Sequence, residues 1–135
     1  MAYSSTPLYK KLGIKPGSRV SVINSPNGYK SWLQLGSVNC DFVPSTTLKA
    51  DIVHIFAKTQ AEFASELHAA KPRIFPAGAI WVSWPKNSAR STIKSSLTEN
   101  AIRDYALTHG LVDVKVASIN DAWSGLKLIY RLKDR

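Results

Sequence analysis

The chain has 135 residues, 44% of them apolar, and a net charge of +9 from 18 basic and 9 acidic side chains. This length predicts one domain over residues 1–135, with residues 1–7 loosely ordered. The lone Cys40 excludes a disulfide framework within one chain, and without an apolar run of ~20 residues or a signal-peptide pattern we expect a cytoplasmic protein with no membrane role.

Apolar alternation and turn formers divide the first half of the chain into short elements. A helical turn is expected at residues 8–13 and a tight turn at 15–18. Strands are expected at 19–24, 38–43 and 50–57, with a short helix at 29–35. Thr59 and Glu62 have the spacing of a capping box, so a second helix should begin there and end at Pro72.

The most apolar stretch runs from Gly78 to Pro85. It is short, β-branched and aromatic, which predicts a strand at residues 79–84 that is covered on both faces, as at the centre of a parallel sheet. A polar and basic segment follows immediately. A buried strand that runs into such a loop is typical of a ligand site in an α/β protein.

The last part of the chain predicts one helix and two strands. Either Ser96 or Thr98 could cap the helix, and Gly110 should end it. Residues 111–119 alternate, with Val112, Val114 and Val116 on one face, and a second alternating segment ends near residue 133. Strands at 111–119 and 125–133 joined by a short loop indicate an antiparallel hairpin.

These elements define the fold class as α/β: a single three-layer Rossmann-like domain with a mostly parallel sheet of about six strands ending in an antiparallel hairpin. The segment Leu12-Gly13-Ile14-Lys15-Pro16-Gly17-Ser18-Arg19-Val20 and the terminal helix–strand–turn–strand resemble S-adenosylmethionine-dependent methyltransferases. With strands numbered along the chain, the resemblance implies the order 2-1-3-4-6-5, with strand six antiparallel between four and five.

A set of motifs also resembles a bacterial family of small proteins classed as domain of unknown function 3052. The motifs are Leu12–Gly17, Asn24–Tyr29, Trp81–Lys86, Gly110–Val116 and Trp123–Lys127. The resemblance implies a small cytoplasmic α/β protein with no established activity. Family members usually have a second Lys after Lys86 and later an Asp. Residues 87–97 contain neither a Lys directly after Lys86 nor a carboxylate, so a family role for acids there does not carry over.

Two loops supply the candidate site. Lys86, Asn87, Ser88 and Arg90 follow the apolar strand, and Asn24, Asn27 and Gly28 follow the first strand. If these loops meet at the carboxyl edge of the sheet, their cations and amides suit a small anion such as sulfate or phosphate. The first loop has one glycine, and its Pro26 lacks an N–H. S-adenosylmethionine and NAD should therefore bind weakly or not at all, and we expect no cofactor.

No catalytic constellation or metal site is visible in the sequence. His54, His68 and His109 are dispersed, and His54 lies within an apolar strand, which favours a hydrogen-bonded core histidine over a base. The sequence therefore favours a non-catalytic domain that binds a small ligand or a partner. Two alternatives remain: a methyltransferase-like transferase with a degenerate cofactor loop, and a basic protein associated with nucleic acid.

Overall fold

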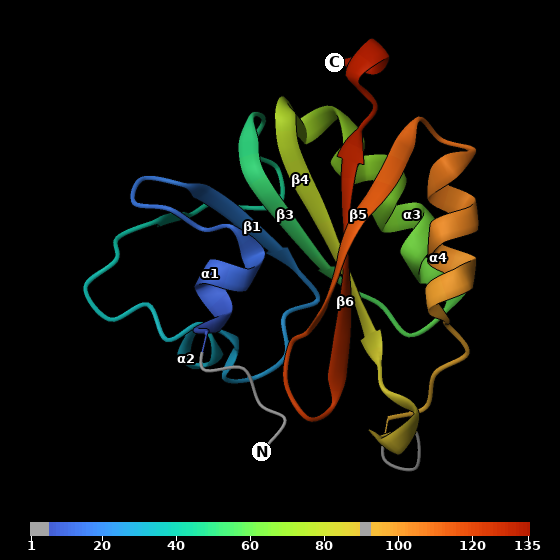
Figure 1. Cartoon of the computed structure of the whole chain (residues 1–135), viewed down its shortest axis with the longest axis horizontal. Coiled ribbons are helices and arrows are strands. Elements are labelled where there is room, and N and C mark those ends of the chain that lie inside the picture. The colour runs from blue at the N-terminus through green and yellow to red at the C-terminus, as the bar shows by residue number, and fades with distance from the viewer. Residues whose placement is uncertain (1–5, 90–92) are drawn as a thin grey trace.

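The computed structural model describes residues 6–89 and 93–135, which form one mixed sheet of six strands (Figure 1). The spatial order is β2-β1-β3-β4-β6-β5. β1, β2, β3 and β4 pair in parallel, and β6 pairs antiparallel with both β4 and β5. The predicted fold class and strand order are therefore confirmed. The strands are β1 (Arg19–Ile23), β2 (Asp41–Phe42), β3 (Ala50–Phe56), β4 (Ile74–Pro85), β5 (Leu111–Ser118) and β6 (Trp123–Tyr130).

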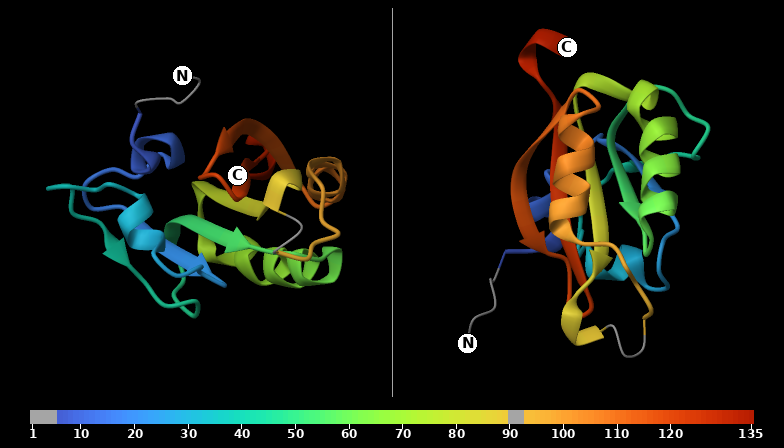
Figure 2. Two further views of the ribbon diagram at one scale, coloured as in Figure 1. Left: turned by 90° about the horizontal axis from the view of Figure 1, so that it is seen from below. Right: turned by 90° about the vertical axis from the view of Figure 1, so that its right-hand side faces the viewer.

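Helices cover both faces of the sheet and complete three layers. α3 (Gln60–Ala70) and α4 (Glu99–Leu107) lie on one face, whereas α1 (Leu8–Leu12) and α2 (Tyr29–Trp32) lie on the other (Figure 2). Single 3-10 turns occur at Lys71–Arg73, Asn87–Ala89 and Leu132–Asp134. Within the described residues, no helix is long and apolar enough to cross a lipid bilayer.

Side-chain caps fix where the two longer helices begin. The Thr59 hydroxyl accepts the Glu62 N–H at 3.1 Å, which confirms Thr59 as the cap. Glu62 in turn accepts the N–H of Lys58 at 2.9 Å, one residue before the cap, so the reciprocal bond of the predicted capping box is displaced by one residue. At α4 the hydroxyl of Thr98 accepts the Ala101 N–H at 3.2 Å. Of the two caps that the sequence left open, Thr98 is therefore the one used.

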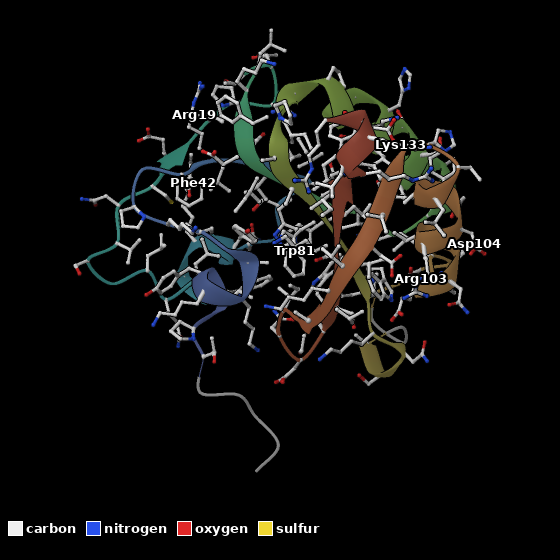
Figure 3. All side chains as sticks on the ribbon, turned by 45° about the horizontal axis from the view of Figure 1, so that its top comes forward. Arg19, Phe42, Trp81, Arg103, Asp104 and Lys133 are labelled. Carbon is white, nitrogen blue, oxygen red and sulfur yellow. The ribbon has the colours of Figure 1, made fainter. Side chains whose placement is uncertain are left out.

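β4 lies between β3 and β6 and is buried on both faces from residue 78 onward, as the apolar run predicts. Ile80 and Val82 pack in the cluster beneath α3 and α4. Trp81 points to the opposite face, is fully buried near the centre of the molecule (Figure 3), and donates its indole N–H to the Leu12 carbonyl at 3.1 Å. One strand thus anchors both outer layers.

Three strands differ from their predicted limits by more than one residue. β2 is reduced to Asp41–Phe42. β6 begins at Trp123 because the side-chain oxygen of Asn120 accepts the N–H groups of Ala122 and Trp123 and closes the turn early. β4 begins at Ile74: residues 75–78 bulge out of its pairing with β3, so Pro76 removes no pairing hydrogen bond.

A second bulge, in β5, means that Val112, Val114 and Val116 do not share one face as predicted. Asp113 pairs with Leu128 and Lys115 with Lys127, so Val114 is the extra residue. The insertion reverses the alternation beyond it, and both Val114 and Val116 are about half exposed instead of facing the core. The predicted apolar face therefore exists only at the start of this strand.

The central position of Trp81 leads to a stability prediction. Trp81→Ala should lower the free energy of unfolding by ~3–5 kcal/mol in denaturant titrations, because it leaves a cavity in the core. Trp81→Phe should cost less, since it loses the hydrogen bond to Leu12 but keeps an aromatic ring. Leu132→Ala, at a side chain that is 81% exposed, is the control and should change stability by no more than ~0.5 kcal/mol. A loss below ~1 kcal/mol for Trp81→Ala would contradict the packing of β4.

Candidate functional site

The sheet has a topological switch point between β1 and β3. The chain leaves β1 to form β2 on one side and then returns to form β3 on the other. A cavity of about 430 Å³ lies at the carboxyl ends of these two strands. We call it the switch-point cavity; it is lined by Asn24, Ser25, Pro26, Asn27, Phe56, Lys58, Glu62 and Trp123. This is the position at which open α/β sheets bind ligands.

Side chains hold the loop that follows β1. Asn24 adopts a positive φ of 57° and donates its amide N–H to the Phe56 carbonyl at 3.2 Å, tying the β1 loop to the end of β3. Gly28 (φ 84°) lets the chain turn into α2, but it does not line the cavity. Among the described residues, the backbone N–H groups of Asn27 and Gly28 have no acceptor. The loop thus offers exposed amide and N–H donors.

The floor of the switch-point cavity is aromatic. Phe56 and Trp123 meet edge to face, with ring centroids 5.0 Å apart, and the Phe56 ring also stacks on His54. Trp123 is only 6% exposed, and among the described residues Trp81, not Trp123, is the Trp whose indole N–H donates to an acceptor. A buried donor of this kind requires a partner from water or from a ligand. The sequence alone does not show which Trp indole lacks a partner, because that depends on the tertiary arrangement.

A buried hydrogen-bonded chain supports this floor. The hydroxyl of Tyr29 lies 2.7 Å from His54 Nδ1, and His54 Nε2 lies 2.7 Å from the Ser83 hydroxyl. A neutral imidazole supplies one donor and one acceptor, which two hydroxyls can match. Burial lowers the pKa of His54 to about 3, and the ring is inaccessible to solvent. His54 is therefore a satisfied core histidine, as the sequence predicts, and it cannot reach a substrate.

The charged groups at the switch-point cavity are Lys58 and Glu62, both exposed. One carboxylate oxygen of Glu62 accepts the Lys58 N–H in the helix cap, which leaves the other oxygen available. The pair balances its charge, so polarity here comes mainly from amides and N–H groups. No group of three or more His, Cys, Asp or Glu side chains in residues 6–89 and 93–135 is arranged to hold a metal ion.

The second predicted loop lines a different cavity. Lys86 and Asn87 contribute to a depression of about 450 Å³ between the end of β4 and the start of α4, which we call the α4 cavity; its other lining residues are Trp84, Thr98, Glu99, Asn100 and Ser124. Ser88 is exposed and lines neither cavity, and Arg90 lies outside the described residues.

The sheet explains why the two predicted loops do not share a cavity. β3 separates β1 from β4, so their ends lie about two strand spacings apart, or roughly 10 Å. Successive residues of β6 also point to opposite faces: Trp123 lines the switch-point cavity and Ser124 the α4 cavity. The structure therefore brings Asn24 together with Asn27, and Lys86 together with Asn87, but in two places.

A third cavity, of about 460 Å³, was not predicted. It lies near the amino ends of β3 and β4, where the bulge at residues 75–78 exposes Phe75 beside Lys15, Asp51 and Lys127. Ligand sites in open α/β sheets lie at the carboxyl ends, so the switch-point cavity remains the candidate site.

Comparison with known proteins shows the fold. No protein-family model and no curated protein matches the chain. A methyltransferase dependent on S-adenosylmethionine from Aquifex aeolicus matches with a TM-score of 0.63 and 13% identity, over 92% of this chain and 88% of its own. A second such methyltransferase, from Thiobacillus denitrificans in complex with S-adenosyl-L-homocysteine, matches with a TM-score of 0.60 and 10% identity, over 96% of this chain and 92% of its own.

The ribosomal protein L11 methylase of Lactobacillus delbrueckii subsp. bulgaricus gives a TM-score of 0.61 and 10% identity, over 92% of this chain and 75% of its own. Such identities establish a methyltransferase-like Rossmann fold and nothing finer. The resemblance to domain of unknown function 3052 stays a prediction, because it rests on the sequence motifs alone.

The buried His54 predicts a pH dependence of stability. The unfolded chain binds a proton at this residue below about pH 6.5, but the folded chain does so only near pH 3. Stability should therefore fall as the pH drops through this window, by roughly 2 kcal/mol from pH 8 to pH 5. Urea titrations at several pH values measure the slope. His54→Gln should flatten the slope between pH 5 and 7, whereas His68→Gln, at an exposed position, should preserve it; equal slopes in the two variants would contradict this assignment.

Proposed function

We propose that the protein binds a nucleoside-containing ligand of the S-adenosylmethionine class in the switch-point cavity, as a methyltransferase-like protein with a degenerate cofactor loop. The observation that carries the proposal is Trp123, a nearly buried residue that lines the switch-point cavity and whose indole N–H has no acceptor among the described residues. The methyltransferase-like fold supports the same position.

The adenosine half of such a ligand fits the described residues. The aromatic floor of Trp123 and Phe56 offers an apolar contact for a flat base, and the indole N–H can donate to a ring nitrogen or a ribose oxygen. The amides of Asn24 and Asn27 and the second oxygen of Glu62 supply further polar groups. The volume of about 430 Å³ is within the usual range for small-molecule sites.

The amino-acid half of the ligand fits less well. Pro26 has no N–H, and every residue from Asn24 to Asn27 carries a side chain, so backbone donors cannot surround a carboxylate closely. The N–H groups of this loop without an acceptor among the described residues include those of Ser25, Asn27 and Gly28. We therefore expect binding to be led by the adenosine half and to be weak.

S-adenosylmethionine, when bound, would supply an activated methyl group. The chain's own residues would bind and orient the nucleoside, but the described residues at the switch-point cavity offer little for moving a proton: Glu62 caps α3, and His54 is enclosed. This scarcity of bases favours a second candidate function, in which the domain binds its ligand without catalysis. An assay for methyl transfer at saturating ligand distinguishes the two functions, because only the transferase would turn over.

Titrations of adenosine and S-adenosylhomocysteine, followed by calorimetry and by the ¹⁵N-edited indole signals of the four Trp residues, test the site. Both ligands should shift the Trp123 indole signal and bind within about tenfold of each other. Trp123→Phe removes the N–H but keeps an aromatic ring. It should weaken binding ~3–10-fold, which is the loss in affinity expected when about one hydrogen bond is removed. Asn27→Ala should also weaken it.

Two matched variants serve as controls for this titration. Trp84→Phe removes the other indole that lines a cavity, and Asn39→Ala removes an exposed amide outside the switch-point cavity. Both should leave adenosine binding unchanged. The proposal would be abandoned if adenosine left the Trp123 indole and the Asn27 amide unshifted, or if Trp84→Phe weakened binding as much as Trp123→Phe.

A further inference from the structure

The α4 cavity collects hydrogen-bond donors from three separate elements. β4 contributes Trp84, the 3-10 turn after it contributes Asn87, and the first residues of α4 complete the wall. Figure 1 shows the segment after β4 and the start of α4 at the same end of the molecule. The switch-point cavity lies beside different strand ends and shares none of these residues.

Trp84 supplies a buried donor without a partner. The residue is 7% exposed, and no described residue accepts a hydrogen bond from its indole N–H, in contrast to the indole of Trp81. Trp81, three residues earlier on the same strand, shows the usual arrangement, with its indole bonded to the Leu12 carbonyl. Because buried donors are almost always paired, the cavity that Trp84 lines is where an acceptor from water or a ligand is required.

The amino terminus of α4 points its own donors at the same place. α4 has nine residues, and its cap, Thr98, uses its hydroxyl for the Ala101 N–H. The N–H groups of Glu99 and Asn100 belong to the first turn and have no acceptor within the helix. These groups, together with the helix dipole, favour an anion at this end.

Lys86 adds a positive charge that is held in place. Its backbone N–H donates to the Ala122 carbonyl at 2.8 Å, and its ammonium group donates to the Ser118 hydroxyl at 2.6 Å. An ammonium has three donors, so two remain. The neighbouring Asn87 is exposed and lines the cavity, so its side-chain amide can donate as well.

Glu99 is the only carboxylate among the described residues that line the α4 cavity. It does not stand alone, because Arg103 binds it at 2.5 Å and also binds Asp113 at 2.9 Å (Arg103 is labelled in Figure 3). The guanidinium offsets the charge of Glu99. The remaining negative charge of Glu99 should nevertheless weaken the binding of an anion. Neutralising Glu99 should therefore strengthen binding, whereas loss of Lys86 should weaken it.

We infer that the α4 cavity is a binding site for a phosphate group, held by the Trp84 indole, the Lys86 ammonium, the Asn87 amide and the first N–H groups of α4. Tetrahedral oxyanions accept several hydrogen bonds at once, which matches a cavity that offers donors and one cation. The inference stands apart from the proposed function, because it uses different residues and a different ligand.

Titration with inorganic phosphate, followed by backbone and indole ¹⁵N signals, tests the site. The largest shifts should fall on the Trp84 indole and on the amides of Glu99 and Asn100, while the indoles of Trp81 and Trp123 should stay in place. A parallel titration with ribose 5-phosphate separates two sources of the group. Tighter binding of the sugar phosphate assigns the site to a larger ligand, and equal binding assigns it to free phosphate; both outcomes support the site.

Variants supply the energetic test. Lys86→Ala should weaken phosphate binding about tenfold at low salt, with an effect that shrinks as salt rises. Lys133→Ala removes the same charge beyond the far end of β6 and should change binding little. Trp84→Phe should weaken binding, and Glu99→Gln should strengthen it. The folded state of each variant is checked by its spectrum in the absence of phosphate.

Three results would overturn the inference: no binding of either phosphate compound by the wild-type protein, largest shifts away from the α4 cavity, or equal losses for Lys86→Ala and Lys133→Ala. The readout also separates this site from the proposed function. Phosphate reports on the Trp84 indole and adenosine on the Trp123 indole, so either assignment can fail while the other holds.

Discussion

The burial of β4 on both faces is the constraint on which the rest of the structure depends. A strand covered on both sides requires two outer layers, and each layer here is anchored by alternate residues of this strand. Burial also forces its polar groups to find partners. The Trp81 indole donates to the Leu12 carbonyl at the end of α1. The Ser83 hydroxyl hydrogen-bonds to His54, and the other ring nitrogen of His54 hydrogen-bonds to Tyr29 at the start of α2.

This polar chain explains how the candidate site keeps its shape with few glycines. Tyr29 follows the β1 loop directly, so its bond to His54 fixes one end of the loop, while the Asn24 amide fixes the other end to the Phe56 carbonyl. Burial also raises the pKa of the Tyr29 hydroxyl, which therefore stays protonated and able to donate. The loop is therefore held at both ends by side-chain hydrogen bonds.

Local chemistry made much of the fold predictable. The spacing of Thr59 and Glu62, the apolar run at 79–84 and the alternation near the end of the chain each act over a few residues, and each gave the correct element. The bulges were not predictable in this way. The bulge at Val114 follows from how β5 pairs with β6, and alternation read along one strand carries no information about its partner.

The candidate site was predictable only in part, for a geometric reason. The sequence identified two polar loops at the carboxyl edge of the sheet, and both line cavities. It could not show that an intervening strand keeps them apart, nor that two buried indoles would lack partners, because both depend on the tertiary arrangement.

Trp84 and Trp123 occupy equivalent situations on either side of the sheet. Each belongs to a hydrophobic cluster, and each leaves one donor unpaired beside a cavity. Both cavities are open to solvent, so water can pair each N–H when no ligand is bound, and the acceptor of a ligand can replace that water. The two indoles therefore locate, more specifically than the loops themselves, the points at which this fold is arranged to meet a hydrogen-bond acceptor.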